Sequence, residues 1–375
     1  MSDASFSSSE RRIALLEKAL TIYSPSGNEK ALAALLYAEL KELGLNPKID
    51  SAGNVVCEAG SGKKSLLFCG HMDTVPGEMP VKRVGDWLYG RGACDAKGPL
   101  LSLLFAFEDT ALKLNENAGP GRNGRLIFTA VVEEEGESSG LNQLMKDSIR
   151  ADYAIFGEPG GLDRITLGYR GHLTITITVE TQEVHSSAPW LTTNSIEAAM
   201  AVYSDLKNTW PEAKKGESKT ASVSVSLTRI HGGSAHNVTP GKTTMTVDIR
   251  LPIGTNSARI KTEVEKIIGK HGSLENGARI DVSYGEATEP YRAGMDSTLV
   301  RSMNRALLKS GVKPTFITKS GTGDMNTYAL GFGVEAITYG PGDTRLSHTT
   351  EEKIDAKEVL GCSAILYSAL EELFS

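Results

Sequence analysis

Cysteine is scarce in this chain of 375 residues, and its four cysteines, Cys57, Cys69, Cys94 and Cys362, are scattered. That usage argues against a disulfide framework. No run approaches the ~18 apolar residues of a membrane helix, and the polar, serine-rich start does not resemble a signal peptide. The net charge of −6 argues against general nucleic-acid binding. We therefore expect a soluble, cytoplasmic protein that binds neither membranes nor nucleic acid.

The first part of the chain alternates short apolar strands with helices, which indicates an α/β fold with a mostly parallel sheet covered on both faces. Strands are predicted at 65–70, 126–132, 153–157 and 334–339, and helices at 10–23, 29–43, 98–114 and 355–373. We expect Asn28 to cap the helix at 29–43, and Asp355 with Glu358 to cap the last helix.

From about residue 168, apolar and polar residues alternate strictly, which is typical of antiparallel strands with one face in water. Strands are expected at 173–179, 222–227, 245–249 and 280–284, and helices at 195–208 and 257–270. This order of elements predicts a ferredoxin-like α+β domain. We assign it to residues 166–286, inserted into a larger domain formed by 1–165 and 287–375, because the length exceeds what one core usually organises.

Ionisable residues follow several of the predicted parallel strands, at the ends where ligands gather in open α/β sheets. They are His71, Glu134, Glu135, Glu158 and, after a short loop, His348. Asp95 lies in a glycine-rich stretch just before a predicted helix, where it is a candidate bridge between two cations. Two imidazoles, three carboxylates and a spare glutamate match a carboxylate-bridged pair of divalent metals with a general base.

Each of these residues also has a structural interpretation when taken alone. A histidine after a strand is commonly structural, the run 133–135 fits a solvated face, and Asp95 fits a helix cap. The joint pattern favours the metal site, because the run directly follows the apolar stretch 130–132 and so begins inside the sheet. Cys69 would share a strand face with His71 and could therefore be a further ligand, but its apolar surroundings are typical of a buried strand.

Asp73 is a candidate supporting residue for His71. The two residues are two positions apart, so their side chains point to one face of a strand. We expect Asp73 to accept the second ring N–H of His71, as carboxylates commonly do for metal-bound histidines. The alternative is that Asp73 only begins the following turn.

The sequence frames around these residues resemble those of the co-catalytic zinc peptidases and deacylases, which include acetylornithine deacetylase and succinyl-diaminopimelate desuccinylase. The frames are His-x-Asp at 71–73, Gly-Arg-Gly-x-x-Asp-x-Lys-Gly at 90–98, Glu-Glu-Glu at 133–135, Gly-Glu-Pro-Gly at 157–160 and His-Thr at 348–349. The resemblance covers nearly the whole chain, including the inserted domain. It departs at Glu133, where the family usually has aspartate.

The resemblance implies a site for two Zn²⁺ ions, with Co²⁺ as a substitute. One ion would be held by His71 and Glu158, the other by Glu135 and His348, and Asp95 would bridge them. Glu134 would be the general base that takes a proton from the attacking water and returns it to the leaving amine. The division of roles between Glu134 and Glu135 stays open.

In the inserted domain, the resemblance implies that His185 reaches into the active site of a neighbouring subunit and helps to stabilise the oxyanion. A homodimer is therefore expected. An ordinary loop histidine is the alternative. Asn237 and Arg250 lie in the stretches that resemble the family's substrate-binding residues, and they are candidates for contacts with the scissile group or a substrate carboxylate.

The frame 319–326 resembles the branch that releases lysine or ornithine from the amino-group carrier protein LysW. Thr322, Asp324 and Asn326 would line the pocket for the product's cationic side chain, since a desolvated ammonium needs a partner. Helix capping is the alternative interpretation, and Gly323 departs from the small polar residue expected there. The basic pairs 11–12, 82–83 and 214–215 are candidate carrier contacts or solvated faces.

Two other kinds of function are compatible with these patterns. One is a hydrolase of free acylamino acids or dipeptides, such as an acetylornithine or acetyl-lysine deacetylase or a desuccinylase. The other is a non-catalytic binding protein on the same fold, against which the complete set of ligands and base argues. Only the frame 319–326 separates a carrier-linked substrate from a free one.

Overall fold

The chain divides into two compact units, which we describe from a computed structural model covering residues 3–115, 124–214, 216, 218–271 and 278–374. The first unit consists of Met1–Gly168, Arg292–Ile317 and Gly323–Ser375. The second consists of Tyr169–Tyr291 with the short segment Thr318–Thr322. Across these described ranges, no helix combines the length and the apolar character needed to cross a bilayer.

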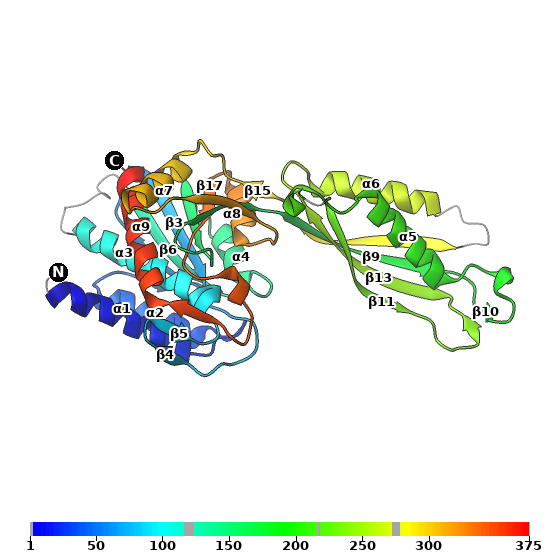
Figure 1. Cartoon of the computed structure of the whole chain (residues 1–375), viewed down its shortest axis with the longest axis horizontal. Helices are drawn as coiled ribbons and strands as arrows, with labels where there is room; N and C mark the ends of the chain where they lie inside the picture. Colours follow the sequence, from blue (N-terminus) through cyan, green and yellow to red (C-terminus); the bar gives the residue numbers. More distant parts are fainter. Residues whose placement is uncertain (1–2, 116–123, 215, 217, 272–277, 375) are drawn as a thin grey trace. The chain divides into compact units, whose positions relative to one another are not determined.

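A nine-stranded sheet forms the centre of the first unit, counted over the residues that the structure describes (Figure 1). Its strands are β1 (Lys48–Ile49), β2 (Val55–Ala59), β3 (Lys64–His71), β6 (Gly124–Val131), β7 (Tyr153–Gly157), β8 (Arg164–Tyr169), β15 (Tyr291–Arg292), β16 (Thr315–Lys319) and β17 (Glu335–Thr338). Their order is β1-β2-β6-β3-β7-β17-β8-β15, with β16 beside β8. The neighbours β6, β3, β7 and β17 are parallel, as their apolar sequences predict.

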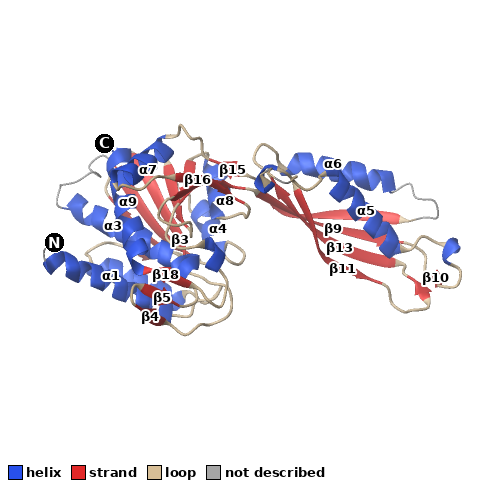
Figure 2. Cartoon of the chain, viewed as in Figure 1, coloured by secondary structure: helices blue, strands red, loops and turns tan. Residues whose placement is uncertain are grey.

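Helices lie on both sides of this sheet in Figure 2. They are α1 (Asp3–Thr21), α2 (Lys30–Glu42), α3 (Gly98–Asn115), α4 (Ser139–Lys146), α7 (Thr298–Lys309), α8 (Asp324–Phe332) and α9 (Ala356–Phe374). The apolar α3 packs against β3, β6, β7 and α9, while α8 packs against β7 and β17. A small sheet of β4 (Lys82–Val84), β5 (Trp87–Tyr89) and β18 (Lys353–Asp355) completes the unit.

The second unit is built on an antiparallel sheet with two helices packed on one face. The strands are β9 (Gly171–Glu180), β11 (Ser224–Gly232), β13 (Lys242–Leu251) and β14 (Arg279–Thr288), and the helices are α5 (Ser195–Thr209) and α6 (Ser257–His271). The strand order β11-β13-β9-β14 is that of the expected ferredoxin-like sandwich. The core contains Leu173, Ile175 and Ile177 on β9, so the alternating residues bury one face of the sheet. A separate pair joins β10 (Val184–His185) to β12 (Val238–Thr239).

Of the predicted helix caps, Asp355 is confirmed, whereas Asn28 and Glu358 are wrong. The residue before α2 is Glu29 rather than Asn28, and the Glu29 carboxylate accepts hydrogen bonds from the amides of Gly27 and Glu133. At α9, Asp355 does accept the amide of Lys357, but Glu358 does not fold back to complete a capping box. Its carboxylate instead accepts the amides of Leu162 and Gly342 from two other loops. Glu29 and Glu358 therefore bind amides of distant segments, while Asp355 makes the local cap of α9.

Glu108 on α3 is a buried carboxyl group that forms no ion pair with any residue the structure describes. Its side chain is 2% exposed, and Oε1 has no hydrogen-bond partner among the described residues. Burial raises the pKa of Glu108 to about 8 from an ordinary 4.5, and the nearby Glu39 raises it further. The folded chain therefore keeps a proton that the unfolded chain releases between these two pH values.

Glu108 is expected to make the protein less stable at alkaline pH. Because the folded-state pKa lies above the unfolded one, the free energy of unfolding falls as the pH rises from about 4.5 to 8, by at most roughly 5 kcal/mol. Urea unfolding of Glu108→Gln and wild type at pH 6 and pH 9 measures this effect. Wild type should lose more stability between the two pH values than the variant does. Equal losses would contradict the burial of an uncharged Glu108.

Candidate metal centre

The polar residues predicted to form the site meet at one edge of the sheet. His71 is the last residue of β3, which pairs in parallel with both β6 and β7. Glu134 and Glu135 follow the end of β6, and Glu158 follows the end of β7. Because the carboxyl ends of parallel strands lie at the same edge, three separate chain segments deliver ligand atoms to one place.

Asp95 stands between two histidines. His71 Nε2 is 3.4 Å from Asp95 Oδ1, and His348 Nε2 is 3.4 Å from Asp95 Oδ2. His71 Nε2 also lies 3.7 Å from Glu158 Oε1. Two ligands of a tetrahedral ion with ~2.0–2.1 Å bonds lie roughly 3.3 Å apart, so these separations suit ligands of a shared ion better than direct hydrogen bonds. One carboxylate oxygen faces each imidazole.

The donor set fits divalent metal ions. His71 Nε2 is buried and has no hydrogen-bond partner in the part of the chain that the structure describes. The donor atoms of His71, Asp95 and Glu135 lie within 4.8 Å of one another, as do those of His71, Glu134 and Glu158. His348 Nε2 is 2.6 Å from Glu135 Oε1, a hydrogen-bond distance that would have to lengthen by several tenths of an ångström to admit an ion. Imidazole and carboxylate together are ligands typical of zinc.

Asp73 supports the candidate ligands through hydrogen bonds. His71 Nδ1 lies 3.0 Å from the Asp73 backbone oxygen and 3.3 Å from Asp73 Oδ1, and the shorter contact is the better hydrogen bond. Either acceptor fixes the proton on Nδ1 and leaves Nε2 free to bind a metal. The Asp73 carboxylate also accepts the amides of Glu134 and Glu135, both at 3.0 Å. It therefore positions one histidine and the whole turn that carries two glutamates.

Asp73→Asn is expected to weaken metal binding by about 10–100-fold, the usual cost of losing an outer-shell carboxylate. The new amide would turn an N–H group toward the amides of Glu134 or Glu135, which need an acceptor. Metal affinity is measured by competition with a chromogenic chelator. The control is Asp152→Asn, because Asp152 accepts the Ser65 amide near the other end of β3. Equal affinities in the two variants would contradict the role of Asp73.

The predicted substrate residues of the second unit form two separate groups. His185 on β10 is exposed and opposite Val238, the neighbour of Asn237, and the Asn237 carbonyl accepts the amide of Ser186. Arg250 lies near the far end of β13, where its Nε is 3.0 Å from Asp248 Oδ1. Eight residues of strand separate Lys242 at the start of β13 from Arg250, a length of about 27 Å. The two groups are therefore at opposite ends of the sheet.

The 319–326 frame is divided between the units. Thr322 belongs to the second unit, whereas Asp324 and Asn326 open α8 in the first unit. Asp324 is 7% exposed, and burial raises its pKa to about 6. Its Oδ2 has no hydrogen-bond partner among the described residues. The residue before α8 is Gly323, which has no side chain that could cap the helix.

Comparison with known proteins decides the family. The family model described as "Peptidase family M20/M25/M40" matches residues 67–372, which include every residue of the cluster. The chain belongs to peptidase family M20/M25/M40. The resemblance inferred from the sequence frames is thereby confirmed, and the family is one of hydrolases.

Relatives within the M20 family align over almost the full length of both chains. The "[LysW]-lysine/[LysW]-ornithine hydrolase" of Sulfurisphaera tokodaii is 33% identical, covering 96% of this chain and 94% of its own. The "[LysW]-lysine hydrolase" of Deinococcus radiodurans is 32% identical, covering 96% of each chain.

Solved structures confirm the fold of this chain. The aminopeptidase PepT of Bacillus cereus superposes with a TM-score of 0.83 at 20% identity, covering 98% of this chain and 99% of its own. YXEP of Bacillus subtilis, described as "a Dinuclear Metal Binding Peptidase from M20 Family", superposes with a TM-score of 0.76 at 15% identity, covering 97% and 98%. The expected α/β architecture with an inserted α+β unit is therefore confirmed.

The pKa values of the candidate metal ligands are shifted because several charged groups lie close together. Burial raises the pKa of Glu134 well above its ordinary value, and Glu158 adds to the effect. Burial alone would lower the pKa of His71, but the carboxylates of Asp73 and Asp95 raise it well above the ordinary value. The nearby Asp95 carboxylate, together with that of Glu135, raises the pKa of His348 to about 9. Without metal, protons therefore occupy the positions that cations would take. Metal binding must release these protons, so we expect the affinity for metal to fall at acid pH.

Sequence reasoning missed the residues that hold the glutamate turn in place. Glu29 accepts the amide of Glu133, and the Ser26 hydroxyl donates to Asp73 Oδ2 at 2.7 Å. Both come from the loop between α1 and α2, far from the turn in sequence. The only local signal is a polar stretch, 24–29, which has the composition of an ordinary loop.

Proposed function

We propose that this M20 hydrolase releases lysine or ornithine from a LysW-type amino-group carrier protein by hydrolysing an amide bond. The observation that carries the proposal is the alignment of the two relatives bearing those names over 96% of this chain. The clustered imidazoles and carboxylates supply the chemistry that amide hydrolysis needs.

Two divalent ions would occupy the cluster, and we propose Zn²⁺, with Co²⁺ as a substitute. His71 and Glu158 would hold one ion, Glu135 and His348 the other, and Asp95 both. The two 3.4 Å separations from Asp95 to the histidines support this division. The description of the Bacillus subtilis neighbour as dinuclear supports only the number of ions. When bound, the ions lower the pKa of water and polarise the substrate carbonyl.

Glu134 would act as the general base and then as the general acid. Its carboxylate takes a proton from the attacking water and returns it to the nitrogen of the leaving amino acid. Burial supports this role, because a raised pKa lets Glu134 hold the proton between the two transfers. Glu135 is the better candidate ligand, because its Oε1 lies next to His348 Nε2.

The second unit would contribute to substrate binding from two subunits. His185 would donate an N–H to the developing oxyanion, Asn237 would contact the scissile group, and Arg250 would bind a carboxylate through its planar fork. Since about 27 Å of strand separates Arg250 from the start of β13, one small substrate cannot touch both groups of a single chain. A homodimer that pairs His185 of one chain with the cluster of the other resolves this separation.

Asp324 would recognise the side-chain ammonium of the released amino acid. The support is its buried Oδ2, which has no hydrogen-bond partner within the described ranges. A desolvated ammonium group would supply both the missing donor and the missing charge. We propose that Asn326, two residues further along α8, lines the same pocket. Thr322, which belongs to the second unit, stays a prediction from the sequence.

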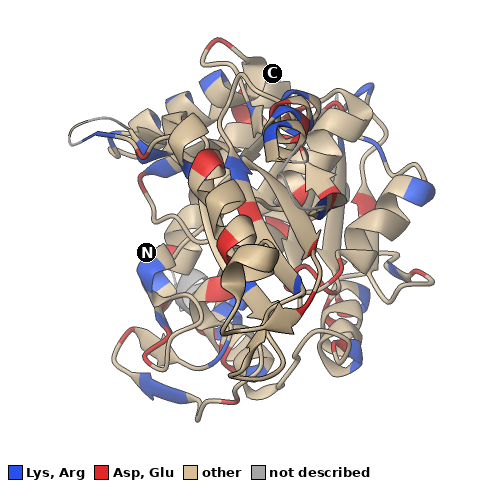
Figure 3. Cartoon of the chain, turned by 90° about the vertical axis from the view of Figure 1, so that its right-hand side faces the viewer, with Lys and Arg blue, Asp and Glu red and all other residues tan. Residues whose placement is uncertain are grey.

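Two of the basic pairs considered as carrier contacts, 11–12 and 82–83, contain arginines that lie beside acidic residues. Arg12 pairs with Asp109, and Arg83 lies near Glu10 and Glu17. Acidic and basic residues are interspersed over the ribbon in Figure 3. These pairs therefore fit solvated faces better than a docking site, while Lys215 of the pair 214–215 lies outside the described residues. The carrier contact is proposed from the relatives' names alone.

A hydrolysis assay tests the substrate. Carrier-linked lysine, carrier-linked ornithine and free N-acetylornithine are compared, each with and without a chelator. The proposal expects turnover of a carrier-linked substrate, its loss with chelator and its return with Zn²⁺. Turnover of the free acylamino acid alone would keep the chemistry but reject the carrier. A metal-loaded protein that turns over none of the three would reject the function.

A further inference from the structure

A buried ion pair contacts the backbone segment that carries Asp95. Arg91 Nη1 is 2.8 Å from Glu352 Oε2, and the two side chains are 8% and 0% exposed. Removing both charges from water is costly, and such a pair often contributes little net stability compared with apolar residues. The position of this pair therefore suggests a role other than stabilising the fold.

The second oxygen of Glu352 holds the backbone that carries Asp95. Glu352 Oε1 accepts the amide of Cys94 at 3.0 Å and the amide of Asp95 itself at 2.9 Å. A carboxylate that accepts two successive amides fixes the orientation of that peptide segment. The direction in which the Asp95 side chain leaves the backbone is thereby set by Glu352.

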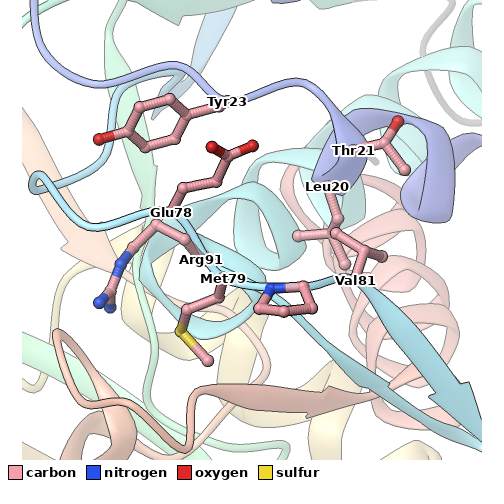
Figure 4. Close-up of a pocket in the computed structure, with 8 residues that line it drawn as sticks. Leu20, Thr21, Tyr23, Glu78, Met79, Val81 and Arg91 are labelled. Atoms are coloured by element: carbon pink, nitrogen blue, oxygen red, sulfur yellow. The ribbon is translucent and has the colours of Figure 1, made fainter.

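Arg91 extends the same restraint to two further loops. Its Nη1 also donates to the Thr349 carbonyl at 3.1 Å, one residue after His348. Its Nε donates to the Gly77 carbonyl at 2.9 Å, in the loop that follows His71 and Asp73. Arg91 also lines a surface pocket of about 480 Å³ with Tyr23 and Glu78 (Figure 4). The planar guanidinium thus joins three loops that begin at, or contain, candidate ligands.

We propose that Glu352 and Arg91 are positioning residues of the metal centre. Together they set the distance between the Asp95 carboxylate and His348, and hence the spacing of the two metal sites. The inference rests on the metal site of the proposed function and is independent of the substrate. Neither residue belongs to the candidate ligand groups, so both would act through the backbone of the ligands.

The test compares Glu352→Gln and Arg91→Lys with wild type. The first variant keeps the size of the side chain and removes its charge. The second keeps the cation beside Glu352 but loses the fork that reaches Thr349 and Gly77. Glu289→Gln is the matched control, because Glu289 also accepts a backbone amide, that of Ser257, in the second unit. Zn²⁺ affinity is measured by chelator competition, and the visible spectrum of the Co²⁺ form reports ligand geometry.

Both variants are expected to bind Zn²⁺ about 10–100-fold more weakly than wild type and to show a shifted Co²⁺ spectrum. Their kcat should fall more than their KM rises. The Zn²⁺-induced increase in Tm is recorded as well, so that a less stable variant still reports on metal binding. Variants that keep wild-type Zn²⁺ affinity and the Co²⁺ spectrum would overturn the inference. A wild-type protein that binds no Zn²⁺ would instead reject the metal site itself.

Discussion

Glu134→Gln is expected to lower kcat by about 10²–10⁴-fold, the usual contribution of a positioned general base. The amide is nearly the same size as the carboxylate but cannot take a proton from water or return one to the leaving amine. KM and the bound metal should change little, because Glu134 is proposed to act on the proton and not as a ligand. Steady-state kinetics together with metal analysis of the purified variant measure both quantities.

Glu137→Gln is the matched control for the general base. Glu137 belongs to the same loop, and its side chain is exposed to solvent. The control should keep wild-type kcat and metal content. If Glu134→Gln instead lost metal while Glu135→Gln kept it, the roles of these two neighbours would be exchanged, as the sequence alone allows. If Glu134→Gln kept full activity, the base would have to be a different residue.

Asp95→Asn is expected to abolish activity through loss of metal. An amide carries no charge and offers only one ligand oxygen, so it cannot bridge two cations. Since even an outer-shell substitution costs 10–100-fold, affinity for at least one of the two ions should fall by at least about 10²-fold. Metal stoichiometry should drop below two ions per chain, as measured by elemental analysis after dialysis.

The control for Asp95→Asn is Asp86→Asn. Asp86 forms an exposed ion pair with Lys357 in the same unit, and such pairs contribute little to stability. This control should bind two ions and turn over substrate as wild type does. Asp95→Asn protein that retains two tightly bound ions would show that Asp95 is not the bridge.

The elements with strong periodic patterns could be predicted from the sequence. β7 occupies the predicted residues 153–157, and α5 differs from its prediction by one residue at its end. The alternation of β9 also indicates which face is buried. These features are local, because side-chain period and apolar character decide them within a few residues.

The convergence of the ligands was predictable for a topological reason. Parallel strands deliver their carboxyl ends to one edge, so residues after β3, β6 and β7 had to lie close together. Contacts between distant segments could not be predicted. The hydrogen bond from the Asp95 amide to Glu352 links positions 257 residues apart, and nothing in either local stretch identifies the other. The hydrogen bond from the Glu133 amide to Glu29 could not be predicted for the same reason, because the two residues lie 104 positions apart.

The most direct measurement for the metal centre is a crystal structure of the Zn²⁺-loaded protein with anomalous scattering recorded at the zinc edge. We predict two peaks per chain, one between His71 and Glu158 and the other between Glu135 and His348. Asp95 should contribute one oxygen to each. A single peak, or two peaks that share no ligand, would contradict the bridged metal centre on which the proposed hydrolysis depends.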